Sequence, residues 1–217
     1  MYSMQENCSE RTGRQSIHPQ VDPPLVTTGQ HVVWENAAWR VECNDVHNRE
    51  TLANQRAVRI SPASESHYEA IVVSLATDGQ LHLLSRYRYP IERWSLEFPR
   101  FDFENGDDGW KEAAEVDLFR LAGLTADKMT LLGAVQADPT VLNSIVVVIL
   151  AEGCRVDSTS RSSTFLDDGS EGVDKPEPLV AGTLALPLLE LIEHIHRGEI
   201  SCCVTLAALT LYRAMFR

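Results

Sequence analysis

The sequence predicts an α+β fold in a single domain with a strand-rich N-terminal piece. Short segments that alternate apolar and polar residues follow one another from His31 onward, as half-buried strands do. One helical segment interrupts these strands, and two amphipathic segments of helical period end the chain. The order is therefore strands, helix, strands and helices, without an internal repeat, which is typical of an α+β domain.

Composition and charge limit the function classes. The 217 residues are 44% hydrophobic and 23% charged, an ordinary globular composition in a chain long enough for one substantial core. Lys and Arg number 19 against 31 Asp and Glu, which gives a net charge of −12. Sequence-independent nucleic-acid binding requires clustered cations, so we expect no nucleic-acid partner. A local basic pocket for an anionic small-molecule ligand remains compatible with this charge.

Cysteine usage and hydropathy indicate the cellular location. The five cysteines are odd in number and lack the spacing of a disulfide framework or a CxxC zinc motif, which favours a reducing, cytoplasmic location. The longest apolar run, Ser144–Ala151, is too short to span a bilayer. The first residues also lack the hydrophobic stretch of a secretory signal, so we expect no membrane partner.

Three regions are predicted along the chain. Residues 1–30 are polar and interrupted by prolines, which predicts a flexible arm. Residues 31–66 contain three alternating runs and form an N-terminal strand extension. The main domain then covers residues 67–217, beginning with two apolar runs around the turn "TDGQ", which predict a hairpin.

The middle of the chain predicts a helix with recognisable ends. In the stretch "RFDFENGDDGWKEAAEVDLFRLAGLTA", Asp107 or Asp108 is suited to be the N-cap. Gly123 is suited to the left-handed position that ends a helix. Two strands follow, "MTLLGAVQA" and "SIVVVILAEG", and the second is apolar enough to be central in a sheet. A long mobile loop is expected over 155–178, before helices over Leu186–Ile200 and Ser201–Phe216.

Three motifs together resemble the Nudix hydrolases, and within them the ADP-ribose pyrophosphatase branch. They are "GQLHLLSRYRYPIERWSLEFP", the helix-bearing segment that ends in "AGL", and "HRGEISCCVTLAALTLY" near the C-terminus. The resemblance covers roughly His31 to Met215. It implies a Nudix α/β/α sandwich whose N-terminal strand extension pairs two subunits into a homodimer.

The helical segment departs from the Nudix consensus where that consensus binds Mg²⁺. Aligned on Gly123 and Leu124, only these two residues and Leu118 match. The other positions carry Asp102 for the opening glycine, Asp108 for the first glutamate, Val116 for the arginine, Asp117 for the next glutamate, and Arg120 and Leu121 for the closing pair of glutamates. The resemblance therefore implies a degenerate Nudix box.

The substitutions change the charge of one helix face. Positions 117, 120 and 121 share a face because they are three and four residues apart, and in the family this face presents carboxylates to Mg²⁺. Two unit charges 4 Å apart interact by roughly 4 kcal/mol at an effective dielectric near 20. At Arg120 this attraction for a cation becomes repulsion. We therefore expect no metal cofactor, and Mg²⁺ binding only if other groups supply it.

Three interpretations of this face stay open. Asp117 and Arg120 form an exposed ion pair while Leu121 joins the core. Alternatively, Arg120 replaces the metal and holds a phosphate or carboxylate with its guanidinium. In the third, other carboxylates between positions 97 and 115 rebuild a metal site, although Glu112 and Glu115 lie on a different helix face.

A candidate ligand-binding set precedes the helix: Arg86, Arg88, Trp94 and Glu97. The resemblance implies that arginines and aromatic residues near this strand grip a nucleotide. Strand alternation places Arg86 and Arg88 on one face, which suits an anion. The alternatives are that both arginines are surface residues and that Trp94 belongs to the core.

Asp138 is the remaining catalytic candidate, beside Asp117 and Arg120. It is the one acid in "QADPTVLNS", which lies where the resembling family carries a loop that often supplies the catalytic base. The alternative is a turn formed by Asp138 and Pro139.

The sequence thus predicts a divergent Nudix-fold protein that has lost the consensus Mg²⁺-binding glutamates. We expect it to act on a phosphate- or carboxylate-bearing small molecule in a biosynthetic pathway. Two alternatives are a weak pyrophosphatase for ADP-ribose-like substrates and a non-catalytic ligand-binding or regulatory protein. Function has to be argued from the site rather than from the fold.

Overall fold

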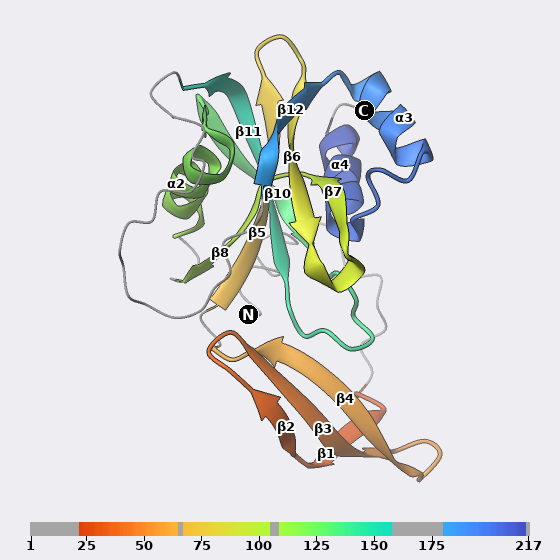
Figure 1. The fold of residues 1–217 in the computed structure, drawn as a ribbon. Coiled ribbons are helices and arrows are strands. Elements are labelled where there is room, and N and C mark those ends of the chain that lie inside the picture. Colours follow the sequence, from red (N-terminus) through yellow and green to blue (C-terminus); the bar gives the residue numbers. More distant parts are fainter. Residues whose placement is uncertain (1–21, 65–66, 105–108, 158–179, 216–217) are drawn as a thin grey trace.

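The computed structural model describes residues 22–64, 67–104, 109–157 and 180–215. These residues form a small N-terminal sheet, a larger sheet, and helices on both faces of the larger sheet (Figure 1). The α/β/α sandwich with an N-terminal strand-rich extension, predicted from the sequence, is confirmed.

The N-terminal sheet is built around one long strand. Its strands are β1 (Leu25–Gly29), β2 (Val32–Glu35), β3 (Trp39–Asn48) and β4 (Asn54–Pro62). Strand β3 is central and pairs antiparallel with the other three. The flexible arm predicted for residues 1–30 is therefore wrong for β1, while residues 1–21 lie outside the described residues. Pro23 and Pro24 precede β1 rather than interrupt it, so its N–H groups are free to pair with β3.

The larger sheet has the path order β10-β11-β5-β6-β12, with β7 beside β6, β8 beside β5 and β9 beside β11. Its strands are β5 (His67–Ala76), β6 (Leu81–Arg88), β7 (Arg93–Glu97), β8 (Arg100–Glu104), β9 (Leu124–Thr125), β10 (Lys128–Val135), β11 (Val146–Val156) and β12 (Val180–Leu186). Strand β11 is parallel to β5 and antiparallel to β10, and its residues 146–151 are buried. The prediction that this apolar run is central is confirmed.

The helices divide the core into two layers. Helix α2 (Trp110–Ala122) lies on one face of the larger sheet, and α3 (Leu188–His196) and α4 (Cys203–Ala214) lie on the other (Figure 1). Ala114 and Leu118 of α2 pack with one set of buried sheet residues. Leu191 of α3 and Val204 of α4 pack with another. Alternating strand residues therefore serve opposite layers, as the pleat of a strand requires.

The ends of α2 agree only partly with the prediction. Gly123 ends the helix with φ 65° and donates to the carbonyls of Leu118 and Phe119, as predicted. The N-cap is Gly109 instead of Asp107 or Asp108, which lie outside the described residues. The loop expected over 155–178 begins later, because β11 continues to Val156; residues 158–179 lie outside the described residues.

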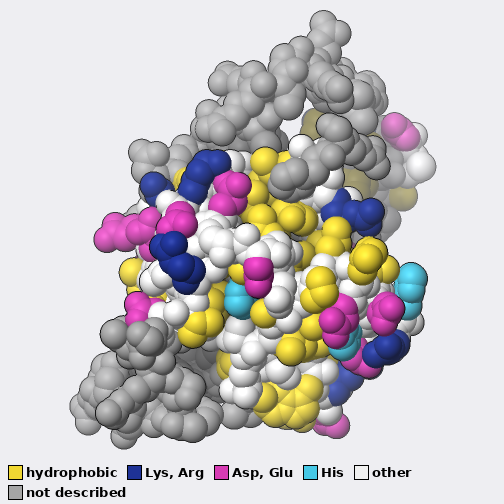
Figure 2. Space-filling view, turned by 90° about the horizontal axis from the view of Figure 1, so that it is seen from above, with side chains coloured by type: hydrophobic (Ala, Val, Ile, Leu, Met, Phe, Trp, Pro, Cys, Tyr) yellow, Lys and Arg dark blue, Asp and Glu magenta, His cyan; other side chains and the backbone are white. Residues whose placement is uncertain are grey.

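Acidic and basic side chains lie side by side on the face seen in Figure 2, with hydrophobic side chains between them. The described residues of that face form no broad patch of like charge. Within the described ranges, every helix is too short or too polar to reach across a lipid bilayer.

Candidate functional site

The face of α2 with Asp117 and Arg120 carries an ion pair. Arg120 Nε donates to Asp117 Oδ1 at 2.7 Å, and the Arg120 side chain is 53% exposed. Leu121 packs against the core layer under α2. The first interpretation therefore describes this face correctly: the guanidinium neutralises Asp117, and Leu121 supplies no polar group.

The described residues contain no group of three or more His, Cys, Asp or Glu side chains arranged to hold a metal ion. Glu112 and Glu115 are both exposed on α2. A Mg²⁺ ion requires several oxygen ligands around one point, so the described part of the chain supplies no ready site for it.

A cluster of charged side chains lies where the larger sheet splits. Strand β5 pairs with β6 only at residues 74 and 75 and with β8 at residues 67 to 71. Strands β6 and β8 therefore pair with different stretches of β5, and the sheet splits between them. Side chains from four strands meet in this split. We call Arg86, Arg88, Arg100, Glu69 and Glu97 the arginine cluster.

Two ion pairs account for four members of the arginine cluster. Arg88 Nε donates to the two carboxylate oxygens of Glu97 at 3.0 and 3.2 Å, and these hydrogen bonds raise the pKa of Arg88. Arg100 forms an ion pair with Glu69. Both carboxylates are only 4% exposed, so each requires its partner to remain ionised in the interior.

Arg86 is the exception. It is 7% exposed, and its Nη1 donates to the carbonyl of Arg100 at 3.0 Å. Its Nε has no hydrogen-bond partner among the described residues, and no described carboxylate lies within ion-pair distance. Burial, with the nearby charge of Arg88, lowers the pKa of Arg86 to about 10. That value is still well above neutral, so Arg86 is a buried cation.

The predicted binding residues are only partly brought together. Arg86, Arg88 and Glu97 meet in the arginine cluster. The alternative that both arginines are surface residues is wrong for Arg86. Trp94 pairs with Tyr87 across the β6–β7 hairpin, whereas Arg86 pairs with Ser95. Directly opposed residues share a face and neighbours along a strand alternate, so Trp94 lies on the other face from Arg86.

Trp94 is not a core residue either. Its side chain is half-exposed at 51%, and its ring meets that of Tyr87 edge to face at 5.7 Å between centroids. The core alternative for Trp94 is therefore wrong, and its ring does not stack on the arginine cluster from the same face.

Asp138 has a turn role. Its carboxylate accepts the backbone N–H of Thr140 at 3.0 Å and the hydroxyl of the same residue, while its carbonyl accepts the N–H of Leu142 at 2.8 Å. The hydrogen bond from the Thr140 side chain lowers the pKa of Asp138. A lower pKa makes a carboxylate a weaker base, so this geometry favours the turn alternative over general-base catalysis.

Sequence reasoning missed Glu69 and Arg100, two members of the cluster. Their ion pair depends on the register that places Ile71 opposite Arg100, which no local pattern gives. A buried glutamate in "YEAIVV" between apolar neighbours was the available signal, because a buried carboxylate requires a cationic or hydrogen-bonding partner.

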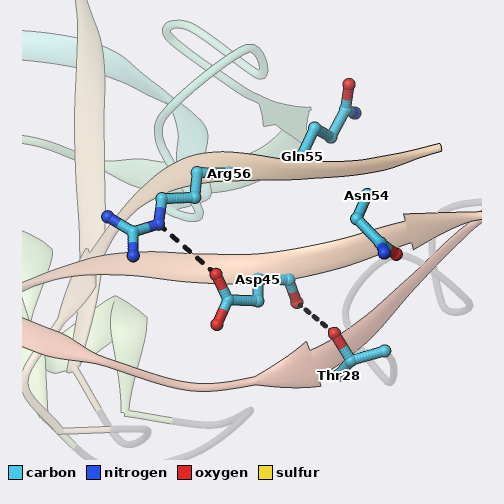
Figure 3. Close-up of a pocket in the computed structure, with 5 residues that line it drawn as sticks. All are labelled: Thr28, Asp45, Asn54, Gln55 and Arg56. Carbon is cyan, nitrogen blue, oxygen red and sulfur yellow. Dashed lines mark hydrogen bonds and ion pairs between the residues drawn. The ribbon is translucent and has the colours of Figure 1, made fainter.

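A separate surface pocket of about 520 Å³ lies on the N-terminal sheet, lined by Thr28, Asp45, Asn54, Gln55 and Arg56 (Figure 3). The Asp45 carboxylate lies 2.9 Å from His31 Nε2 and 3.4 Å from Arg56 Nε. Thr28 donates to the Asp45 carbonyl at 3.2 Å. The charges of this pocket are thus satisfied by one another, in contrast to Arg86.

Neither a scan against protein-family models nor a search of curated proteins found a match. Among solved structures, a protein described as "ADP compounds hydrolase" is similar, with a TM-score of 0.70 and 18% sequence identity over 91% of this chain and 96% of that chain. At this identity the likeness concerns the fold. The chain has a Nudix-like α+β fold.

Proposed function

We propose that the chain binds a phosphate- or carboxylate-bearing small molecule at the arginine cluster and acts on it without the consensus Mg²⁺ site. The observation that carries this proposal is Arg86, a buried guanidinium with an unpartnered Nε. We infer that the consensus glutamates have been lost together with ordinary metal-dependent hydrolysis.

The charge of the cluster supports an anionic ligand. Arg88 and Arg100 are neutralised by Glu97 and Glu69, which leaves the charge of Arg86 without an ion-pair partner among the described residues. An unpaired buried charge is strongly unfavourable. A phosphate or carboxylate oxygen offers a guanidinium charge-assisted hydrogen bonds in matching geometry, so ligand binding satisfies Arg86.

The proposed setting is a biosynthetic pathway in the cytoplasm. In that role the ligand's anionic group is anchored by Arg86, and Arg120 with Asp117 remain candidates for contact with its reacting part. Asp138 is a candidate only if a ligand displaces the hydroxyl of Thr140.

Ligand-induced stabilisation tests the proposal. ADP-ribose, inorganic diphosphate and citrate are added in the presence of EDTA, and the midpoint of thermal unfolding is measured. A ligand that binds only the native state raises this midpoint, and we expect at least one of the three to do so. Arg86→Gln should abolish the shift, while Arg93→Gln, the same change at an exposed arginine of the same hairpin, should retain it. An equal shift in both variants would refute anion binding at Arg86.

The second candidate function is hydrolysis of ADP-containing compounds, favoured by the similar solved structure. It requires a metal site built from groups other than the consensus glutamates. AMP release from ADP-ribose should then depend on Mg²⁺ and be lost in Asp117→Asn or Glu112→Gln. No AMP release in the presence of Mg²⁺ would exclude this function, and turnover that is the same with EDTA would exclude the rebuilt metal site.

We further propose that the chain is a homodimer that pairs through the N-terminal sheet. Trp34 of β2 and Val58 of β4 are each more than half-exposed, and their registers with β3 place them on the same face of the sheet. Exposed apolar side chains grouped on one small sheet are typical of an interaction surface, and a second copy of the sheet would cover them.

A further inference from the structure

Ser95 of β7 carries a buried hydroxyl that the function proposed above does not use. The residue is only 4% exposed, and within the described part of the chain its Oγ takes part in no hydrogen bond. Most buried polar groups have a hydrogen-bond partner, so a buried hydroxyl without one is suited to bind a ligand.

The β6–β7 hairpin places Ser95 directly beside Arg86. The two strands run side by side (Figure 1), and Ser95 is opposed to Arg86 in their register. Directly opposed residues share a face, with Cβ atoms about 4.5–5.5 Å apart. The Ser95 hydroxyl and the Arg86 guanidinium are therefore attached to neighbouring points on one face of the sheet.

Arg86 leaves unused the donor that is closest to its own backbone. Its Nη1 donates to the carbonyl of Arg100 at 3.0 Å, while its Nε has no partner among the described residues. Of the three guanidinium nitrogens, Nε is the one bonded to the side-chain Cδ. The unused donor is thus near the point where the side chain leaves β6, and Ser95 is opposed to Arg86 at this point.

Glu97 is the nearest acceptor along β7, since residues two apart on a strand share a face. Both of its carboxylate oxygens accept from Arg88 Nε, at 3.0 and 3.2 Å, and neither bonds to Ser95. The pair formed by Glu97 and Arg88 carries no net charge that would repel an anion. Ser95 therefore adjoins a cation with a free donor, and its neighbouring carboxylate is already neutralised.

We propose that Ser95 is a further ligand-binding residue, whose hydroxyl donates to the same anion that Arg86 holds through Nε. This rests on the proposed anion-binding function. Donors from two opposed strands then bind different oxygens of one anionic group and fix its orientation across the hairpin. A hydroxyl is an uncharged donor, so it strengthens anion binding without adding a buried charge that would itself need a partner.

The affinity of the full-length protein for inorganic sulfate, measured by calorimetry, tests this role. The oxygens of sulfate can accept from both side chains at once. Hydrogen bonds to charged groups are among the stronger ones, so Ser95→Ala should bind sulfate about tenfold more weakly than the wild type. Ser85→Ala is the matched control and should bind sulfate like the wild type, because Ser85 adjoins Arg86 on β6 and lies on the other face.

Thermal unfolding without sulfate separates binding from stability. Because the Ser95 hydroxyl has no partner among the described residues, its removal leaves no group of the protein unpaired. Ser95→Ala should therefore unfold at about the wild-type midpoint. A lowered midpoint together with wild-type sulfate affinity would give Ser95 a structural role and overturn the proposal.

The same titrations distinguish this inference from the proposed function. Sulfate affinity that is unchanged in Ser95→Ala, or lowered equally in Ser85→Ala, would overturn the role of Ser95, while its loss in Arg86→Gln would leave anion binding by Arg86 intact. Sulfate affinity that is insensitive to Arg86→Gln would refute the proposed function itself. A wild type that binds no sulfate would overturn an anion site shared by Ser95 and Arg86.

Discussion

Single residues of the arginine cluster are held in very different surroundings. Glu97 is 4% exposed and neutralised by Arg88, so the pair is sensitive to the loss of either partner. Removing one member of a buried ion pair typically costs about 3 kcal/mol or more, because the other charge is left unpaired. Glu97→Gln should therefore lower the free energy of unfolding by about 3 kcal/mol, measured by urea denaturation.

The same substitution elsewhere provides the control. Glu193 of α3 and Arg197, which caps the end of this helix, form an exposed pair at 3.2 Å with side chains 65% and 59% exposed. Exposed pairs contribute little, so Glu193→Gln should cost less than about 1 kcal/mol. Equal effects of the two substitutions would mean that Glu97 is not held as a buried carboxylate.

Among the structural elements, α2 depends most clearly on one residue at its end. Gly123 has φ 65°, a left-handed conformation that costs a residue with a side chain roughly 1–2 kcal/mol. Gly123→Ala should destabilise the protein by about this amount in urea denaturation. Gly123→Asn should cost less, because asparagine tolerates this conformation. An alanine variant as stable as the wild type would contradict the requirement for a left-handed helix end.

Elements with a local signal were predicted, and those that depend on distant partners were not. The β5–β6 hairpin and all three described helices follow patterns contained within each segment. Strand β8 was missed although Phe101 and Phe103 alternate with polar residues, because this run adjoins the segment that contains the predicted helix. The segment of β12 is a short apolar run that follows a long polar segment. Only its pairing with β6 identifies it as a strand.

The residues of the candidate site, like the structural elements, were predicted only where the sequence pattern is local. Arg86 and Arg88 were found because strand alternation is local. Glu69 and Arg100 are 31 residues apart in sequence, and only the register of β5 with β8 brings them together. Burial of Arg86 was also unpredictable, since arginine is usually exposed and its surroundings come from four strands.

For the whole molecule, the pH dependence of the free energy of unfolding should reflect the buried His82. Burial lowers the pKa of His82 below 6.5, so the unfolded chain takes up a proton more readily than the native state. Native stability is then greatest above about pH 6.5 and falls as the pH decreases toward the lower native pKa. His82→Gln should flatten this part of the profile in urea denaturation. A wild-type stability that rises on acidification over this range would contradict the sign.

The quaternary structure is tested by light scattering of the purified protein. We expect a dimer for the wild type and a monomer for Trp34→Arg, because a buried, unpaired charge opposes association across the N-terminal sheet. Val116→Arg changes a similarly exposed apolar residue on α2 and should leave the dimer intact. A monomeric wild type, or equal effects of both variants, would argue against pairing through this sheet.

The most direct test of anion binding by Arg86 is calorimetry with ADP-ribose in EDTA, for the wild type and Arg86→Gln. We expect binding without a divalent cation and a loss of affinity of about tenfold to a hundredfold in the variant, as expected for a hydrogen bond to a charged group. Binding that requires Mg²⁺, or that is unchanged in Arg86→Gln, would contradict anion binding by Arg86.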